Sequence, residues 1–334
     1  MTDKKVRWGI ISTANIGMKK VTPAIQKSAH SEVVAIASRD LDRAKVAAAQ
    51  LGIPKAYGSY EELLADPEID AIYNPLPNHL HVPLTLKAFA AGKHVLCEKP
   101  IALTAAEAAM LLAKPANLVF YEAFMVRFHP QWHRVREIMR SGEIGEIKAI
   151  RAVFSYFNRD PSNVRNIAAI GGGGIMDIGS YPIAVSRFLL EAEPRRVVSL
   201  VERDPDFGTD RLASVIADYG NGRQLSFVCS TQAVGQQKLE VIGTRGRIEV
   251  MVPFNAPADE RTAIIIDTGA PFDGSLARRE IIPACDQYTE QAEAFALAVL
   301  GELPLPWGVD DAISQMKVID AVFASETSGG WVNV

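Results

Sequence analysis

Three side chains in this sequence have the types and spacing that acid–base chemistry requires. Lys99 follows directly on a short apolar segment, residues 94–98, which predicts a strand. Asp177 and Tyr181 follow a run of four glycines at 171–174, and their four-residue spacing places them on one face of a helix. An ammonium, a carboxylate and a phenol can hold a substrate hydroxyl and move its proton. Lys99, Asp177 and Tyr181 are therefore the candidate catalytic residues.

The surroundings of Lys99 favour a functional position. Taken alone, Glu98-Lys99-Pro100 is more simply interpreted as a solvated strand end. However, the motif Asn-Pro-Leu-Pro-Asn-His-Leu-His at 74–81 leaves the carboxyl end of another strand one helix earlier. Ligands of open parallel sheets bind beyond the carboxyl ends of the strands, so we expect both segments at one crevice.

The glycine run and a proline flank Asp177 and Tyr181. Four glycines predict a loop that is either mobile or closely approached by other atoms. Pro182 cannot donate to the carbonyl of Ile178 and should kink that turn. If this helix belongs to a second domain, its Asp and Tyr would face Lys99 across an interdomain cleft.

The turn after the first expected strand resembles a phosphate-binding loop. It reads Ser12-Thr13-Ala14-Asn15-Ile16-Gly17. The dinucleotide fingerprint G-x-G-x-x-G falls on Ser12, Ala14 and Gly17, so only its last glycine is present. Small side chains still allow backbone amides near a pyrophosphate at the helix N-terminus. A tight turn without a ligand is the alternative.

The end of the second expected strand indicates which dinucleotide would bind. An NAD site usually places Asp or Glu there to bind the ribose 2′-hydroxyl. This sequence has Ser38-Arg39, and a guanidinium beside a hydroxyl suits a 2′-phosphate. Asp40 follows and could either bind the ribose or cap the next helix. NADP is therefore favoured, with NAD as the alternative.

A metal site is not expected. The pairs His79/His81 and His129/His133 have ligand-like spacing, but no cysteine or carboxylate cluster accompanies them.

The first 125 residues alternate between strand and helix signals. Strands are expected at 6–12, 32–38, 70–74, 94–98 and 118–123, and helices at 15–28, 41–51, 78–91 and 105–113. Asn78 is the expected N-cap of the third helix and Gly92 its stop. Near-continuous apolar strands separated by helices predict an α/β Rossmann domain with a doubly wound parallel sheet over residues 1–125.

The pattern changes after residue 125. A helix is expected near 131–140 and strands at 147–157, 196–201, 212–219, 223–230 and 238–243, with hairpin turns at 220–222 and 243–246. Runs of strands predict an α+β domain with a large, mostly antiparallel open sheet over 126–334. This boundary leaves the C-terminal helix free to pack back on the first domain.

Composition narrows the class of protein. The net charge of −4 argues against wholesale binding to nucleic acid or to membrane phosphates. Apolar runs stay short of the ~20 residues that span a bilayer. The three cysteines lie far apart and predict free thiols in a reducing compartment. A cytoplasmic location is therefore expected.

Together these motifs resemble the glucose–fructose oxidoreductase/inositol dehydrogenase/MocA family over essentially the whole chain. The resemblance rests on the turn at 12–17, Pro-Asn-His-Leu-His at 77–81, Ala-Gly-Lys-His-Val-Leu-Cys-Glu-Lys-Pro at 91–100 and Gly-Gly-Gly-x-x-x-Asp-x-Gly at 171–179. Segments 122–131 and 160–165 are similar to the branch of dimeric dihydrodiol dehydrogenases and NADP-dependent D-xylose dehydrogenases. Like that branch, this sequence has Tyr181 where many inositol dehydrogenase relatives have histidine.

The resemblance implies an NADP-dependent oxidoreductase that acts on a sugar or a related polyhydroxy or cyclic alcohol. Such substrates include aldoses such as D-xylose or glucose, trans-dihydrodiols and dicarbonyl compounds. It also implies a homodimer or homotetramer built through the second-domain sheet. Two alternatives stay open: a relative that cleaves glycosides through a transient redox step, and a non-catalytic NADP-binding sensor.

The expected site follows from these implications. Either Lys99 or Tyr181 would take the hydroxyl proton, because an ammonium beside a phenol favours phenolate and the two titrate as a pair. Asp177 would orient Lys99 or bind a neighbouring hydroxyl. We expect the substrate to contact Lys99, Phe154, Arg165, Asp177 and Tyr181. We expect the cofactor to contact Ser12, Thr13, Ala14, Asn15, Ile16, Ser38, Arg39, Asn74, Pro75, Leu76, Asn78, His79, Glu98, Lys99 and Arg127.

Overall fold

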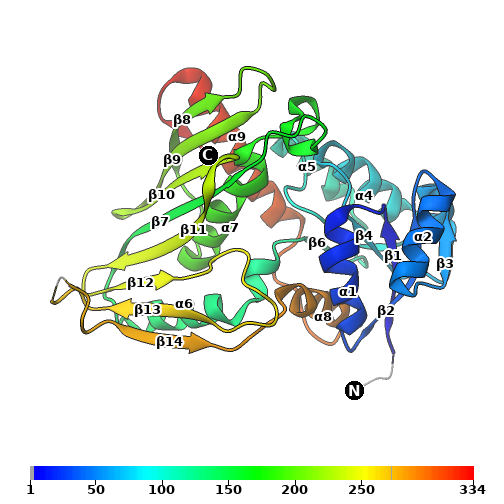
Figure 1. The fold of residues 1–334 in the computed structure, drawn as a ribbon, viewed down its shortest axis with the longest axis horizontal. Helices are drawn as coiled ribbons and strands as arrows, with labels where there is room; N and C mark the ends of the chain where they lie inside the picture. Colours follow the sequence, from blue (N-terminus) through cyan, green and yellow to red (C-terminus); the bar gives the residue numbers. More distant parts are fainter. Residues whose placement is uncertain (1–3, 272) are drawn as a thin grey trace. The chain divides into compact units, whose positions relative to one another are not determined.

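The computed structural model describes residues 4–271 and 273–334, which form two compact units coloured along the chain in Figure 1. The first unit comprises Met1–Met125 and Tyr288–Met316, and the second comprises Val126–Gln287 and Lys317–Val334. The first three residues of the expected first domain lie outside the described part. Residues 288–316, expected in the second domain, group with the first unit.

The first unit is built on a six-stranded parallel sheet. Its order is β3-β2-β1-β4-β5-β6. The strands are β1 (Val6–Ile11), β2 (Ser31–Ala37), β3 (Lys55–Tyr57), β4 (Ala71–Asn74), β5 (His94–Cys97) and β6 (Phe120–Glu122). The order reverses between β1 and β4, and such a switch point is where doubly wound sheets bind ligands. The predicted Rossmann sheet is confirmed, and β3 was not foreseen.

The helices of this unit are α1 (Thr22–Lys27), α2 (Leu41–Leu51), α3 (Tyr60–Ala65), α4 (His81–Ala90), α5 (Ala105–Ala109) and most of α8 (Gln287–Val299). A π turn, Gly17–Val21, precedes α1. On α8, Phe295 packs against Trp8 with ring centroids 5.0 Å apart. The prediction that Asn78 caps the third helix is wrong. Residues 78–80 form a 3-10 turn, and α4 begins at His81 with Leu80 as its N-cap. Gly92 ends it as expected, with φ of +74°.

The second unit contains a nine-stranded sheet with the order β14-β13-β12-β11-β7-β10-β9-β8-β15. The strands are β7 (Ile147–Phe157), β8 (Arg196–Arg203), β9 (Asp210–Gly220), β10 (Arg223–Ser230), β11 (Gln232–Gly243), β12 (Arg247–Val250), β13 (Thr262–Asp267), β14 (Arg278–Ile282) and β15 (Val332–Asn333). Every pairing is antiparallel except that of β7 with β10. The predicted mostly antiparallel sheet is confirmed.

Helices cover one face of this sheet. They are α6 (Pro130–Ser141), α7 (Ser180–Leu190) and the second part of α9 (Val309–Ser328). Ser186 of α7 and Tyr219 of β9 share a hydrogen bond of 2.6 Å, and Ser199 of β8 donates to Val322 of α9. The opposite face exposes apolar side chains such as Leu200, which is 77% exposed. Across residues 4–271 and 273–334, every helix is too short or too polar to traverse a lipid bilayer.

Candidate functional site

Lys99 lies two residues beyond β5, at the carboxyl edge of the parallel sheet. The neighbouring Glu98 is fixed on both sides: its N–H donates to the carbonyl of Asn74 at 3.0 Å, and its carboxylate accepts from the Tyr73 hydroxyl at 2.7 Å. Burial, together with the Glu98 charge, raises the pKa of Tyr73 well above its usual value, so the phenol stays a donor. The two segments expected at one crevice are therefore bonded to each other beside Lys99.

The buried side chain of His81 connects the same two segments. Its ring nitrogens lie 2.8 Å from the carbonyl oxygen of Pro100 and 2.6 Å from that of Leu76. Burial lowers the pKa of His81 to about 4, so the ring is neutral near pH 7 and donates one hydrogen bond. Asn74 adds to this loop, because its side chain accepts from the N–H of Leu76 and donates to the carbonyl of His81.

The turn after β1 has the backbone of a glycine loop without its first two glycines. Ser12 occupies the first fingerprint position with φ of +77°, the left-handed region that glycine ordinarily fills. Its hydroxyl accepts from the N–H of Ala14 at 3.1 Å, which holds the turn closed. The helical run starts at Asn15, and the first N–H groups of a helix have no partners within it. Such a turn suits a phosphate group.

In the turn after β2 the acidic and the cationic side chains have different surroundings. Asp40 is the N-cap of α2, accepting from the N–H groups of Asp42 and Arg43. The capping alternative for Asp40 therefore holds in the structure. Arg39 is exposed beside Tyr60, and Arg43 also acts on this phenol: burial raises the pKa of Tyr60 while the two guanidinium groups oppose the rise. The sequence analysis missed Arg43, which the helical spacing from Arg39 would have suggested.

Other predicted cofactor residues line the loop after β4 or lie in a buried turn. Pro75 and Leu76 are buried, whereas Asn78 and His79 are partly exposed. The Nδ1 atom of His79 is buried and has no hydrogen-bond partner among the described residues. Such an atom calls for a polar ligand group. Arg127 is fully buried in the 3-10 turn Met125–Phe128, which begins the second unit.

In the second unit, Asp177 is the centre of a three-residue polar cluster. One oxygen of its carboxylate accepts from the Tyr156 hydroxyl at 2.7 Å and from the Arg165 guanidinium at 2.8 Å. Asp177 raises the pKa of Arg165, and burial followed by the Asp177 charge raises the pKa of Tyr156. The cluster therefore contains a carboxylate, a guanidinium and a neutral phenol. The sequence analysis named Arg165 as a substrate contact and did not single out Tyr156.

Tyr181 lies among aromatic rings. Phe154 is 5.8 Å from it and Phe254 is 5.6 Å away, measured between ring centroids. Phe154 also stacks on Phe254 at 5.0 Å with an interplanar angle of 16°. Phe154, which is 5% exposed, thus supports the Tyr181 ring. An apolar support holds a phenol rigidly and leaves its hydroxyl as the polar end.

The helix that carries both residues begins with a π turn, Ile175–Gly179, and continues as α7. The distortion expected next to Pro182 is therefore present as this π turn, a feature frequent at functional sites. The glycines before it are closely approached. A Cβ atom on Gly172 would lie 2.6 Å from the Arg165 carbonyl oxygen, which also accepts from the N–H of Gly173. The glycine run thus binds the segment that presents Arg165.

Two groupings of predicted residues result, one in each unit. The first unit holds Lys99 with every predicted cofactor residue except Arg127, and the second holds Arg127, Asp177, Tyr181, Arg165 and Phe154. Within the described ranges, no three His, Cys, Asp or Glu side chains gather as metal ligands would.

Comparisons with known proteins agree with the family resemblance seen in the motifs. Residues 6–119 match the model of the oxidoreductase family with an NAD-binding Rossmann fold, and residues 132–249 match the GFO/IDH/MocA C-terminal domain. An uncharacterized oxidoreductase of Rhizobium meliloti is 46% identical over 98% of this chain and 99% of its own length. The D-xylose 1-dehydrogenase (NADP(+)) 2 of Haloferax volcanii is 38% identical over the same shares.

Among solved structures, a 3-ketoreductase from Actinomadura kijaniata was crystallised in complex with NADP and TDP-benzene. It matches with a TM-score of 0.90 at 30% sequence identity, over 96% of this chain and 98% of that chain.

Proposed function

Because this chain belongs to the oxidoreductase family with an NAD-binding Rossmann fold, we propose that it is an NADP-dependent dehydrogenase or reductase of sugars or related polyhydroxy compounds. The observation that carries the proposal is the arrangement around Asp177. Its carboxylate is bonded to a phenol and a guanidinium, one helical turn before Tyr181. A cluster of this kind suits a ligand with several hydroxyl groups, because it offers acceptors and donors close together.

The first unit fits the cofactor. The Ser12–Gly17 turn suits the pyrophosphate, and the orphaned Nδ1 of His79 suits a polar group further along the ligand. When bound, a nicotinamide supplies a ring carbon that exchanges hydride with the substrate carbon. The loops held by His81 and Asn74 would keep Lys99 and the cofactor-binding backbone in fixed positions.

NADP is favoured over NAD by the turn after β2. Asp40 is bonded to two backbone amides as a helix cap, so it is engaged elsewhere than at a ribose 2′-hydroxyl. Arg39 and Arg43 supply two guanidinium groups, which bind phosphate through charge-assisted hydrogen bonds. The Haloferax volcanii relative is an NADP-dependent enzyme by name, and the Actinomadura kijaniata enzyme was solved with NADP.

The proposed chemistry assigns a role to each catalytic residue. Oxidation of a carbinol removes hydride from its carbon and a proton from its oxygen, leaving a carbonyl. Lys99 and Tyr181 hold that oxygen and share the proton, while Asp177 binds a neighbouring hydroxyl. In the reverse direction the same pair protonates the oxygen of the carbonyl as it is reduced.

The sugar preference comes from relatives. One is named for D-xylose oxidation, and the other is a ketoreductase crystallised with a thymidine diphosphate compound. The test is a panel of aldoses, polyols, dihydrodiols, dicarbonyls and nucleotide sugars, followed at the absorbance of reduced cofactor with NADP and with NAD. We expect turnover with a free aldose and NADP. No turnover with any panel member, despite tight NADPH binding, would overturn the proposal.

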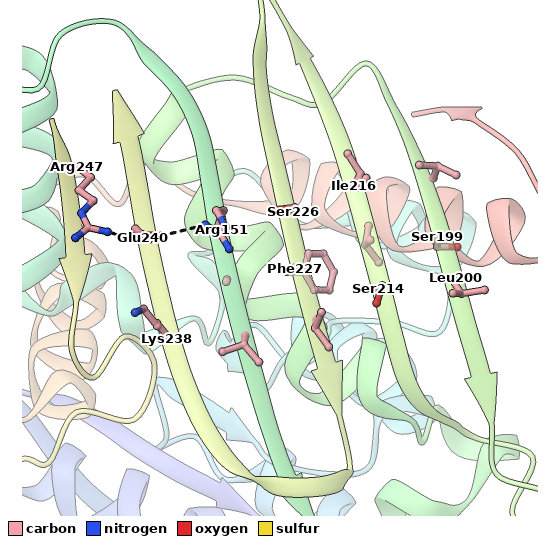
Figure 2. A pocket seen from close by; sticks show the side chains of 15 residues that line it. Arg151, Ser199, Leu200, Ser214, Ile216, Ser226, Phe227, Lys238, Glu240 and Arg247 are labelled. Carbon is pink, nitrogen blue, oxygen red and sulfur yellow. Dashed lines mark hydrogen bonds and ion pairs between the residues drawn. The ribbon is translucent and has the colours of Figure 1, made fainter. Parts of the chain in front are cut away.

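The proposal extends to assembly through the open face of the second-unit sheet. Figure 2 shows this face, with Leu200 and Ile216 on neighbouring strands and Arg151, Glu240 and Arg247 joined by ion pairs beside them. An apolar area beside paired charges of both signs is self-complementary, as a two-fold interface requires. A second copy of this chain is the proposed occupant. The three free cysteines fit the proposed cytoplasmic location.

A further inference from the structure

A buried carboxylate outside the predicted site caps the helix that carries Asp177 and Tyr181. Asp210, the first residue of β9, is 1% exposed. Its Oδ2 accepts from the N–H of Ile175 at 2.6 Å, and Ile175 opens the π turn. The residue in the N-cap position, Gly174, has no side chain to do this. A strand residue 35 positions away thus takes the place of an ordinary helix cap.

The glycine run is shaped around this carboxylate. A Cβ atom on Gly173 would lie 2.0 Å from the Oδ1 of Asp210, and one on Gly174 would lie 3.3 Å from its Oδ2. Gly173 also has φ of +124°, which side-chain-bearing residues rarely adopt. The approach of Asp210 therefore excludes a side chain at Gly173 and leaves little room for one at Gly174.

The same turn leads to Asp177 through backbone hydrogen bonds. The carbonyl of Gly173 accepts from the N–H of Asp177 at 3.1 Å, and the N–H of Gly173 donates to the carbonyl of Arg165 at 2.9 Å. The Arg165 side chain then bonds back to the Asp177 carboxylate. A shift at Gly173 therefore moves both partners of that ion pair.

We propose that Asp210 is a positioning residue, which fixes the turn 172–179 and thereby holds Asp177, Arg165 and Tyr181 in the arrangement that binds substrate. The catalytic part of this inference rests on the proposed function, whereas the structural part does not. An ionised carboxylate makes the stronger, charge-assisted hydrogen bond to Ile175, and a protonated one makes an ordinary bond. Because burial raises the pKa of Asp210, ionisation costs the closed turn more free energy than the stronger hydrogen bond supplies. The turn should therefore be held most firmly when Asp210 is protonated.

The surroundings of Asp210 place its titration near neutral pH. Burial raises its pKa to about 7, opposed by the Ile175 N–H and by Arg203. The charged and titratable groups that act on it or feel its charge are Arg203 on β8, Glu326 on α9, Tyr156 on β7 and Cys229 on β10. Arg203 is paired with Glu326, so the two largely cancel at Asp210.

The test measures amide hydrogen exchange of peptides covering 172–179 in the full chain without ligand, as protection factors corrected for intrinsic pH dependence. We expect protection to be about tenfold lower at pH 8 than at pH 6, because Asp210 has a pKa of about 7 in the folded turn and an ordinary pKa near 4 once the turn opens to water. Asp210→Asn keeps an accepting oxygen and does not titrate, so it should remove this pH dependence, and Asp210→Ala should lower protection at pH 6. Asp204→Asn, a substitution of another buried carboxylate of the β8–β9 hairpin that accepts from Asp206 and Phe207, should leave this segment unchanged.

Kinetics then separate the two proposals. Asp210→Ala should lower kcat/KM for the sugar about fivefold at pH 6, whereas Asp210→Asn should stay close to wild type there, with the NADPH dissociation constant unchanged in both. Equal protection in wild type and Asp210→Ala at pH 6 would overturn the positioning role, whatever the activity. Altered protection in a chain with no turnover on any substrate would instead overturn the proposed function and leave the structural role standing.

Discussion

The hydroxyl of Tyr156 donates to the carboxylate of Asp177 across 2.7 Å, joining the sheet of the second unit to the helix that bears Tyr181. Because the same oxygen accepts from Arg165, that carboxylate is oriented from two sides. An oriented carboxylate can accept from a substrate hydroxyl without first reorganising. Under the proposed function, Tyr156 acts on substrate through Asp177.

Tyr156→Phe should lower kcat/KM for the sugar by about tenfold, since it removes one charge-assisted hydrogen bond to Asp177. Steady-state kinetics at saturating NADP would measure the effect. Tyr219→Phe is the matched control, because Tyr219 is another buried phenol of the sheet that bonds to Ser186. Equal activity of Tyr156→Phe and wild type would show that Tyr156 has no role in the site.

Lys99→Ala and Tyr181→Phe should each reduce turnover well over tenfold, because each removes a group that holds or exchanges the substrate proton. NADPH binding, followed by fluorescence titration, should stay largely intact in Tyr181→Phe, which lies in the second unit. Full turnover in both variants would contradict the assigned reaction centre.

Arg39→Ala and Arg43→Ala should each weaken NADP binding about tenfold and leave NAD binding nearly unchanged, since a guanidinium contributes to affinity for the 2′-phosphate alone. Titration calorimetry with both dinucleotides would measure this ratio. Lys45→Ala is the control, a substitution of an exposed cation of α2 that pairs with Asp42. An equal loss for NAD and NADP would place the two arginines elsewhere than at the 2′-position.

Acid should destabilise the second unit through one of its buried histidines. His129 is the N-cap of α6, accepting from the N–H of Gln131, and burial lowers its pKa to about 4. In the unfolded chain His129 therefore binds a proton near pH 6.5, whereas in the folded chain it binds one only near pH 4. The free energy of unfolding falls across this window as the pH falls. The loss is on the order of 3 kcal/mol at its lower end.

His129→Asn should remove this contribution, since asparagine also caps helices and does not titrate. Urea unfolding at pH 7 and pH 5, followed through the nearby Trp132, would compare the two chains. If both lose the same stability between those values, His129 is not the acid-sensitive group.

Leu200→Glu should convert a dimer into a monomer, because it places a charge in the middle of the proposed apolar interface. Sedimentation analysis would show the mass. Leu112→Glu is the control, since Leu112 is 61% exposed but lies in the first unit. A wild-type chain that sediments as a monomer at micromolar concentration would rule out this interface.

Local sequence pattern was sufficient for most of the first unit and for parts of the second. Continuous apolar strands, Gly92 and the turn 220–222 are short-range signals, and each has the predicted structure. Strands β12 to β14 were overlooked, although three consecutive isoleucines in β13 are a plain strand signal. The family resemblance from the motifs was confirmed by the family models.

The polar contacts of the site were harder to predict, because their partners are distant in sequence. Tyr156 shares the inward face of β7 with Phe154, so the period of two could have suggested its direction but not its bond to Asp177. The contact of Asp210 with Ile175 spans 35 positions and two elements. The residues next to Asp210 in the sequence give no signal of this contact. The four glycines predicted a loop that is either mobile or closely approached, and the group that approaches it was not identified.

The parallel pairing of β7 with β10 determines how late in synthesis the centre of the second-unit sheet can form. As the chain leaves the ribosome, β7 emerges well before the strand that lies beside it in the sheet, and everything from Arg165 to Tyr181 is synthesised in between. A parallel neighbour requires a long crossover, so the centre of the sheet cannot close early. Until β10 and β11 are released, the edges of β7 are open to other nascent chains. Yield at high expression should therefore depend on chaperones that shield this half-built sheet.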